Sequence, residues 1–144
     1  MDTESAIVLS GIKAVVVDDN RVMCRVMAAI LEGVGCDVVT ASDGFSALGK
    51  IVDHTPDVIV LDTSLPRLDG YQVCAVIKQN PKFRQCPVVL VSVSGSLMDR
   101  AQAQAVGADR VLVKPLVREE LLAVVGQLTA PVHLEETLAI RHGG

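Results

Sequence analysis

The stretch AVVVDDN, residues 14–20, decides the fold, because it joins an apolar strand directly to an acidic site. Its run of alanine and valine is continuous rather than alternating, which is typical of a strand buried on both faces of a parallel sheet. Asp18 and Asp19 follow the run without a break. Because like charges this close disfavour each other's ionised form, the pair indicates a site that recruits a positive partner.

Similar short apolar runs recur along the chain, and we expect strands at 14–17, 37–41, 57–61, 87–91 and 110–113. The stretches between and after them have helical length and period, and we expect helices at 20–34, 43–54, 70–79, 97–108 and 117–129. This alternation predicts an α/β domain with a parallel sheet and helices on both faces. Right-handed crossovers favour the doubly wound (βα)5 arrangement with strand order 2-1-3-4-5, which places the second strand at an edge.

The apolar spacing also predicts which helix residues face the core. We expect these to be Val22, Val26, Ala29, Ile30 and Gly33 in the first helix, Val73, Val76 and Ile77 in the third, and Leu121, Val124, Val125 and Leu128 in the fifth. The fourth helix has few apolar anchors, which are Leu97, Ala101, Ala105 and Val106. Because few buried contacts give low local stability, we expect this helix to be loosely held.

Composition excludes several classes of protein. The 144 residues carry a formal net charge of −4 and lack the basic footprint of a nucleic-acid-binding protein. No apolar run is long enough to cross a membrane, and the acidic start MDTESAIVLSGIK differs from the basic start of a secretory signal. The four cysteines form no CxxC pair, which disfavours a zinc or redox site. We therefore expect a cytoplasmic protein with one domain.

Polar residues stand at the carboxyl ends of the expected strands, the edge at which doubly wound sheets bind ligands. Asp18 and Asp19 follow the first strand, Asp62 the third, Ser92 the fourth and Lys114 the fifth. Three aspartates and one lysine sum to a formal charge of −2, which is unfavourable unless a cation joins them. Carboxylate oxygens select a hard cation, so we expect Mg²⁺ (or Mn²⁺) with several bound waters.

With the cation bound, this site would be neutral and ready for an anion. A lysine and a serine hydroxyl suit phosphoryl oxygens, and an aspartate beside them can act as a nucleophile that forms an acyl phosphate. A single aspartate after a strand usually caps a turn or a helix, but polar groups at four strand ends favour one common site. The residues therefore predict phosphoryl chemistry.

Four motifs cover these strand ends: VVVDDN, VLDTSLPRLDG, VSVSG and VLVKPL. Together they resemble the receiver domain of two-component response regulators, over about residues 12–129. The resemblance implies a flavodoxin-like fold and a signalling module rather than an enzyme. Residues 1–11 would then be an N-terminal tail, and 130–144 a C-terminal tail or linker.

The resemblance implies a role for each matching acidic residue. Asp62 would accept the phosphoryl group, and Asp18, Asp19, Asp62 and the backbone carbonyl of Ser64 would bind the metal. Within the acidic pair, we expect Asp19 to bind the ion directly and Asp18 to act through water. Ser64 and Ser94 would flank the phosphoryl group and tune its slow self-hydrolysis.

The resemblance also implies the groups that stabilise the phosphoryl group and transmit the signal. These are the hydroxyl of Ser92, the backbone amide of Val93 and the ammonium of Lys114, with a cis peptide bond expected at Lys114–Pro115. Many receivers carry an aromatic residue three positions before the lysine, where this chain has Val111. Because valine has little volume to move, we expect the signal to pass through Ser92, the loop after it and the fourth helix.

The implied partners are a histidine kinase or a phosphotransfer protein as donor and a downstream protein target, with no binding of nucleic acid or membrane by this chain itself. Receivers also pair through the face formed by the fourth helix, fifth strand and fifth helix. The segments GCDVVTASDGFSALGKI and PRLDGYQVCAVIKQNP are similar to stand-alone regulators of type IV pilus twitching motility, which chemotaxis-like kinases phosphorylate.

Three alternatives remain open at this point. The chain could be the receiver piece of a longer regulator with a DNA-binding or enzymatic output domain. A phosphohydrolase of the haloacid dehalogenase type would carry a second aspartate two residues after the nucleophile, where this chain has Ser64. A flavodoxin-like FMN carrier would need a phosphate-binding loop after the first strand, where Asp18 and Asp19 would repel the phosphate.

Overall fold

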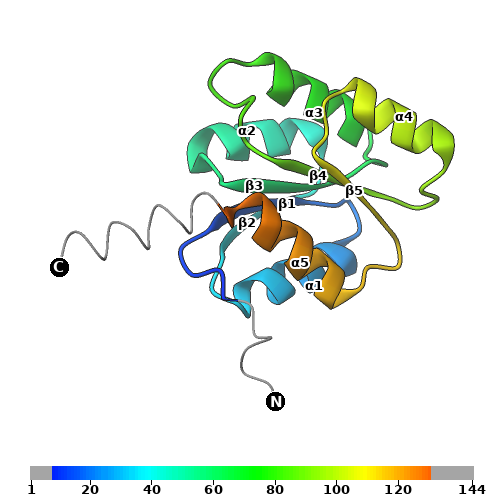
Figure 1. Ribbon diagram of the computed structural model, residues 1–144. Coiled ribbons are helices and arrows are strands. Elements are labelled where there is room, and N and C mark those ends of the chain that lie inside the picture. Colours follow the sequence, from blue (N-terminus) through cyan, green and yellow to red (C-terminus); the bar gives the residue numbers. More distant parts are fainter. Residues whose placement is uncertain (1–7, 131–144) are drawn as a thin grey trace.

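The computed structural model describes residues 8–130, which form one parallel sheet with helices on both faces (Figure 1). The strands are β1 (Lys13–Val17), β2 (Asp37–Ala41), β3 (Val58–Asp62), β4 (Val88–Ser92) and β5 (Arg110–Val113). The helices are α1 (Arg21–Glu32), α2 (Gly44–His54), α3 (Gly70–Gln79), α4 (Leu97–Ala105) and α5 (Arg118–Leu128). The strand order is β2-β1-β3-β4-β5, which confirms the doubly wound (βα)5 fold.

Two hydrophobic layers sandwich the sheet. Helices α1 and α5 cover one face, while α2, α3 and α4 cover the other (Figure 1). Along β1, Ala14 and Val16 belong to the first layer, and Val15 and Val17 belong to the second. The apolar residues of β1, β3 and β4 are buried on both faces, as their continuous runs predict. The edge strands β2 and β5 are only partly buried.

The face predicted for α1 is wrong. Val22 and Val26 are 70% and 45% exposed. The buried residues are instead Cys24, Met27, Ala28 and Leu31. The helix carries two apolar stripes side by side, and spacing alone does not say which of them meets the sheet.

Two smaller predictions about helix faces also need correction. In α3, Val73 and Ile77 are buried as predicted, but Val76 is 46% exposed because it sits at the rim of the α2–α3 contact. In α4, three of the four expected anchors (Leu97, Ala101 and Ala105) are exposed. The one buried residue of this helix is Ala103. Helix α4 is therefore held by even less packing than its sequence predicts.

The packed domain begins before residue 12. Leu9 is 2% exposed and lies in the hydrophobic layer under α1 and α5. Its backbone N–H donates to the carbonyl of Val34 at 2.7 Å. The predicted tail at 130–144 lies outside the described residues, except for Ala130. Within residues 8–130, no helix is both long and apolar enough to cross a membrane.

Candidate functional site

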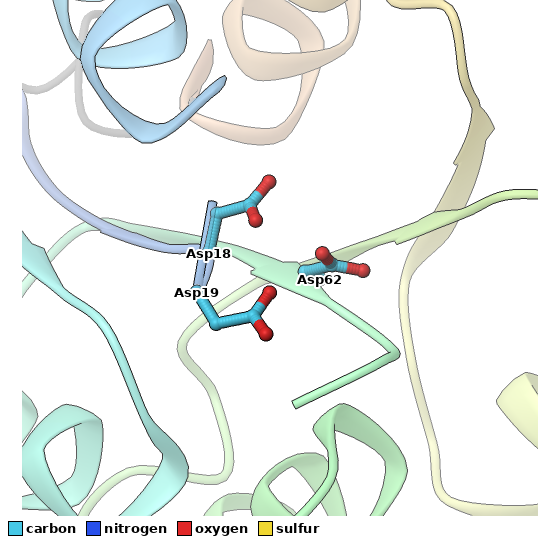
Figure 2. Close-up of side chains that lie close together, drawn as sticks. All are labelled: Asp18, Asp19 and Asp62. Carbon is cyan, nitrogen blue, oxygen red and sulfur yellow. The ribbon is translucent and has the colours of Figure 1, made fainter. Parts of the chain in front are cut away.

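Three carboxylates converge at the carboxyl ends of β1 and β3 (Figure 2). Asp18 and Asp62 are 1% and 2% exposed, whereas Asp19 is exposed to solvent. One oxygen from each carboxylate lies within 4.8 Å of the others. The strand order explains this meeting, because β1 pairs directly with β3 and aligns Val17 with Leu61, the residues just before Asp18 and Asp62.

The backbone fixes one oxygen of each buried carboxylate. Oδ1 of Asp18 accepts the N–H of Asn20 at 2.9 Å, and Oδ1 of Asp62 accepts the N–H of Ser64 at 3.1 Å. The other oxygens face Lys114, whose Nζ lies 3.0 Å from Oδ2 of Asp62 and 3.4 Å from Oδ2 of Asp18. Lys114 thus balances part of the negative charge from the end of β5.

The pKa values of Asp18 and Lys114 show that the negative charge of this site is only partly balanced. Burial raises the pKa of Asp18, the N–H of Asn20 opposes that shift, and the charge of Asp62 adds to it. Burial by itself would lower the pKa of Lys114. The hydrogen bond that its Nζ donates to Asp62, together with the charges of Asp62 and Asp18, raises this pKa overall. One ammonium is therefore shared by an excess of carboxylates.

Gly70 sets the distance between Asp62 and α3. A Cβ at this position would overlap the carbonyl oxygen of Asp62 and lie 2.7 Å from the Cα of Thr63. The N–H of Gly70 donates to the carbonyl of Thr63 at 3.0 Å, so the start of the helix rests on the backbone of the strand end. A capping box between Asp69 and Gln72 then begins α3. The glycine that closes the Asp62–Gly70 motif thus serves close packing.

Ser92 lies at the end of β4, but its hydroxyl is engaged elsewhere. It is 1% exposed, and its Oγ donates to Oδ2 of Asp99 in the first turn of α4 at 2.8 Å. The hydroxyl of Ser94 donates to the same oxygen. These hydrogen bonds, Ser94 first, lower the pKa of Asp99, so the acceptor is ionised.

The sequence interpretation missed Asp99 and its neighbour Tyr71. Asp99 stands three residues after Ser96, whose Oγ caps α4 by accepting the N–H of Asp99 at 3.1 Å. The Ser-x-x-Asp spacing before a helix is a capping signature and could have marked the position. No sequence signal indicates that two serines of the preceding loop bind the same carboxylate.

The remaining predicted positions lie around this edge. The side chain of Val93 is 67% exposed, and Ser64 is exposed. Val111 packs in the layer beneath α2, α3 and α4, where it is only partly buried. The Lys114–Pro115 peptide bond is cis.

The acidic cluster fits a magnesium ion. Its donors are all carboxylate oxygens, the ligands that this hard cation prefers. Their separations of up to 4.8 Å are close to the spacing of about 4 Å between opposite ligands of an octahedral Mg²⁺. A divalent charge would also neutralise the excess left by Lys114. Asp18, Asp19 and Asp62 could therefore hold Mg²⁺.

This fold and this edge define a class of phosphoacceptor signalling domain. The chain matches the family model of the response regulator receiver domain over residues 14–126 and belongs to that family. It is a receiver domain of two-component signalling, a family that binds Mg²⁺ in its acidic pocket and implies a histidine kinase partner and an output target.

Relatives differ in how much of their length this chain covers. It is 47% identical over 115 residues to Protein PilG of Pseudomonas aeruginosa, covering 80% of this chain and 85% of PilG. It is 38% identical to the probable transcriptional regulator ycf27 of Guillardia theta, covering 77% of this chain but 42% of that longer protein. The solved chemotaxis response regulator CheY4 of Vibrio cholerae is similar, with a TM-score of 0.77, 28% identity, and coverage of 81% of this chain and 98% of CheY4.

Proposed function

We propose that Asp62 accepts a phosphoryl group from the phosphohistidine of a histidine kinase or a phosphotransfer protein. The observation that carries this proposal is the placement of Asp62, which is buried, oriented by Ser64 and paired with Lys114 beside two further carboxylates. A carboxylate oxygen attacks phosphorus, the P–N bond breaks, and its electron pair stays on the imidazole nitrogen of the donor.

The residues around Asp62 each make a different contribution to stabilising the phosphoryl group during that transfer. Asp18, Asp19, Asp62 and the backbone carbonyl of Ser64 would hold Mg²⁺, and the bound ion would supply positive charge to the phosphoryl oxygens. Lys114 is already within 3.0 Å of Asp62 and provides a second positive charge on the other side. The hydroxyl of Ser92 and the backbone N–H of Val93 complete the set once the phosphoryl group is present. Ser64 and Ser94 set how fast water removes it.

We further propose that the protein acts as a stand-alone receiver in a chemotaxis-like pathway that controls twitching motility. Its coverage of most of PilG and nearly all of CheY4 supports this reading. The longer regulator of Guillardia theta supports the alternative, a receiver joined to a DNA-binding output domain. The α4–β5–α5 face, where Leu97 and Met98 are 87% and 80% exposed, is our candidate surface for the target or a second copy.

Chemical phosphorylation tests the acceptor. The protein is incubated with Mg²⁺ and acetyl phosphate, and intact mass spectrometry counts the added phosphoryl groups. Asp62→Asn should take up none. Asp53→Asn, an exposed aspartate on α2, is the matched control and should behave as the wild type. Stoichiometric modification of Asp62→Asn would refute the assignment. Phosphotransfer from a panel of histidine kinases then identifies the pathway.

A further inference from the structure

Asp99 is the shared hydrogen-bond acceptor of the β4–α4 segment, residues 92–99. Its Oδ2 accepts the hydroxyls of both Ser92 and Ser94. The Oγ of Ser92 in turn accepts the N–H of Gly95 at 3.3 Å. The Ser92 hydroxyl therefore donates its single proton to Asp99 on α4 rather than to Asp62.

A serine hydroxyl has only one proton to donate. Ser92 cannot donate it to Asp99 and to a phosphoryl oxygen on Asp62 at the same time. If Asp62 is the phosphoacceptor, as proposed above, Asp99 competes with the phosphoryl group for Ser92. The two hydrogen bonds are mutually exclusive states of one side chain.

Tyr71 places an aromatic side chain of α3 near Asp99. Burial raises the pKa of its hydroxyl, and the charge and hydrogen-bonding oxygen of Asp99 raise it further, while Thr63 opposes the shift. Its ring is partly buried against the same hydrophobic layer as Val111 and Val106. An aromatic ring thus lies in this layer, supplied by α3 although position 111 on β5 has none.

Little packing opposes a movement of Asp99. In α4 the side chain of Ala103 is buried, while Leu97 and Met98 are largely exposed at the start of the helix. The segment is held instead by its own polar contacts, such as the 3.1 Å hydrogen bond from Nε of Arg100 to the carbonyl of Gly95. Side-chain hydrogen bonds exposed to water are easily exchanged for others.

We propose that Asp99 is the latch of the unphosphorylated state: it holds the hydroxyls of Ser92 and Ser94 and is released when Ser92 turns to the phosphoryl group. Asp99 is then a positioning residue, because it acts through Ser92 and does not touch the reacting atoms. Release frees the first turn of α4 and moves the charge of Asp99 away from the hydroxyl of Tyr71. The movement is carried by α4 in place of a ring on β5.

Affinity for beryllofluoride, a phosphoryl analogue, tests the latch at equilibrium in the presence of saturating Mg²⁺. Removing the competitor in Asp99→Ala should tighten binding by about tenfold, the worth of roughly one charge-assisted hydrogen bond. Asp99→Asn keeps the shape and loses the charge, so it should fall between the wild type and Asp99→Ala. The matched control is Ser96→Ala, which removes the cap of the same turn but leaves the Ser92–Asp99 hydrogen bond.

Two results would overturn the latch. One is an Asp99→Ala affinity equal to or weaker than that of the wild type. The other is the same gain in Ser96→Ala, since a merely loosened α4 would then explain the effect.

Tyr71 offers a second readout, because it is the only tyrosine and the sequence has no tryptophan. When beryllofluoride binds the wild type, the fluorescence of Tyr71 should shift to the level that Asp99→Ala shows without beryllofluoride. In both proteins the Asp99 carboxylate is no longer beside Tyr71. Unchanged fluorescence at saturation would show that Asp99 stays in place and would overturn the latch. Asp62→Asn separates the two proposals: if it binds beryllofluoride as well as the wild type does, the phosphoacceptor assignment itself fails.

Discussion

The two sides of the same sheet edge are built in opposite ways. At the acceptor side, Asp18 and Asp62 are buried and oriented by backbone N–H groups, and α3 packs directly on the strand end through Gly70. At the switch side, the β4–α4 segment is held by side-chain hydrogen bonds near the surface. Helix α3 buries Gly70, Val73, Cys74 and Ile77, whereas α4 buries Ala103. A receiver of this design fixes the chemistry rigidly and leaves the response to a loosely held element.

The largest expected effect is a loss of folding stability at the acceptor side, where Gly70 packs against the strand end. Gly70→Ala should lower the free energy of unfolding by about 3 kcal/mol or more, because its Cβ would overlap backbone atoms of Asp62 and Thr63 that cannot move aside. Chemical denaturation measures this loss.

The matched substitution is Gly49→Ala in α2. Gly49 is exposed, and a Cβ there meets no atom within 4 Å. This variant should be more stable than the wild type by up to about 1 kcal/mol, since alanine favours a helix over glycine. Equal effects at the two positions would contradict the close packing at Gly70.

The second prediction concerns the metal. Asp19→Ala should raise the Mg²⁺ dissociation constant at least about tenfold, or 1.4 kcal/mol, because it removes a charged oxygen donor from the cluster. Isothermal titration calorimetry with Mg²⁺ alone measures the change. Asp99→Ala removes an aspartate of the switch side and should leave Mg²⁺ affinity unchanged. An Asp19→Ala affinity equal to that of the wild type would refute the acidic pair as a metal site.

The rigid side is also the side that the sequence predicts well. Asp18, Asp62 and Lys114 follow continuous apolar runs, and the parallel topology brings the ends of those runs together. The strand order alone is enough to predict that these three residues lie at the same edge of the sheet. The same logic places Ser92 at the correct strand end.

What the sequence predicts poorly depends on choices between near-equal local arrangements. Helix α1 has two apolar stripes, and the one through Met27 and Leu31 meets the sheet. The partner of Ser92 depends on how a short polar loop folds back on Asp99. Such hydrogen bonds differ little in energy from their alternatives in water, so residue pattern does not select among them.

The third prediction compares two helix caps. Asp69 caps α3 and Ser96 caps α4, each by accepting a backbone N–H of the first turn. Asp69→Ala should lower the global free energy of unfolding by about 1 kcal/mol, since α3 unfolds with the core. Ser96→Ala should change global stability less and speed hydrogen exchange of the α4 amides more. Equal global losses would show that α4 is as firmly integrated as α3.

The smallest expected effect is a pH dependence at the rigid side. Burial raises the pKa of Asp18 above its ordinary 3.8 in the folded state, so the folded protein binds this proton more tightly than the unfolded chain does. The stability that Asp18 contributes is therefore complete below pH 3.8 and is lost as the pH rises through the raised value.

Without Mg²⁺, the wild type should gain stability relative to Asp18→Asn as the pH is lowered from neutral towards that range. Unfolding free energies of both proteins, measured over this pH series, give the difference directly. Asp53→Asn, an exposed aspartate outside the cluster, should show no such trend against the wild type. A difference that does not change with pH would mean that Asp18 is already satisfied without the metal, and the need for a cation at this edge would then rest on Asp19 and Asp62 alone.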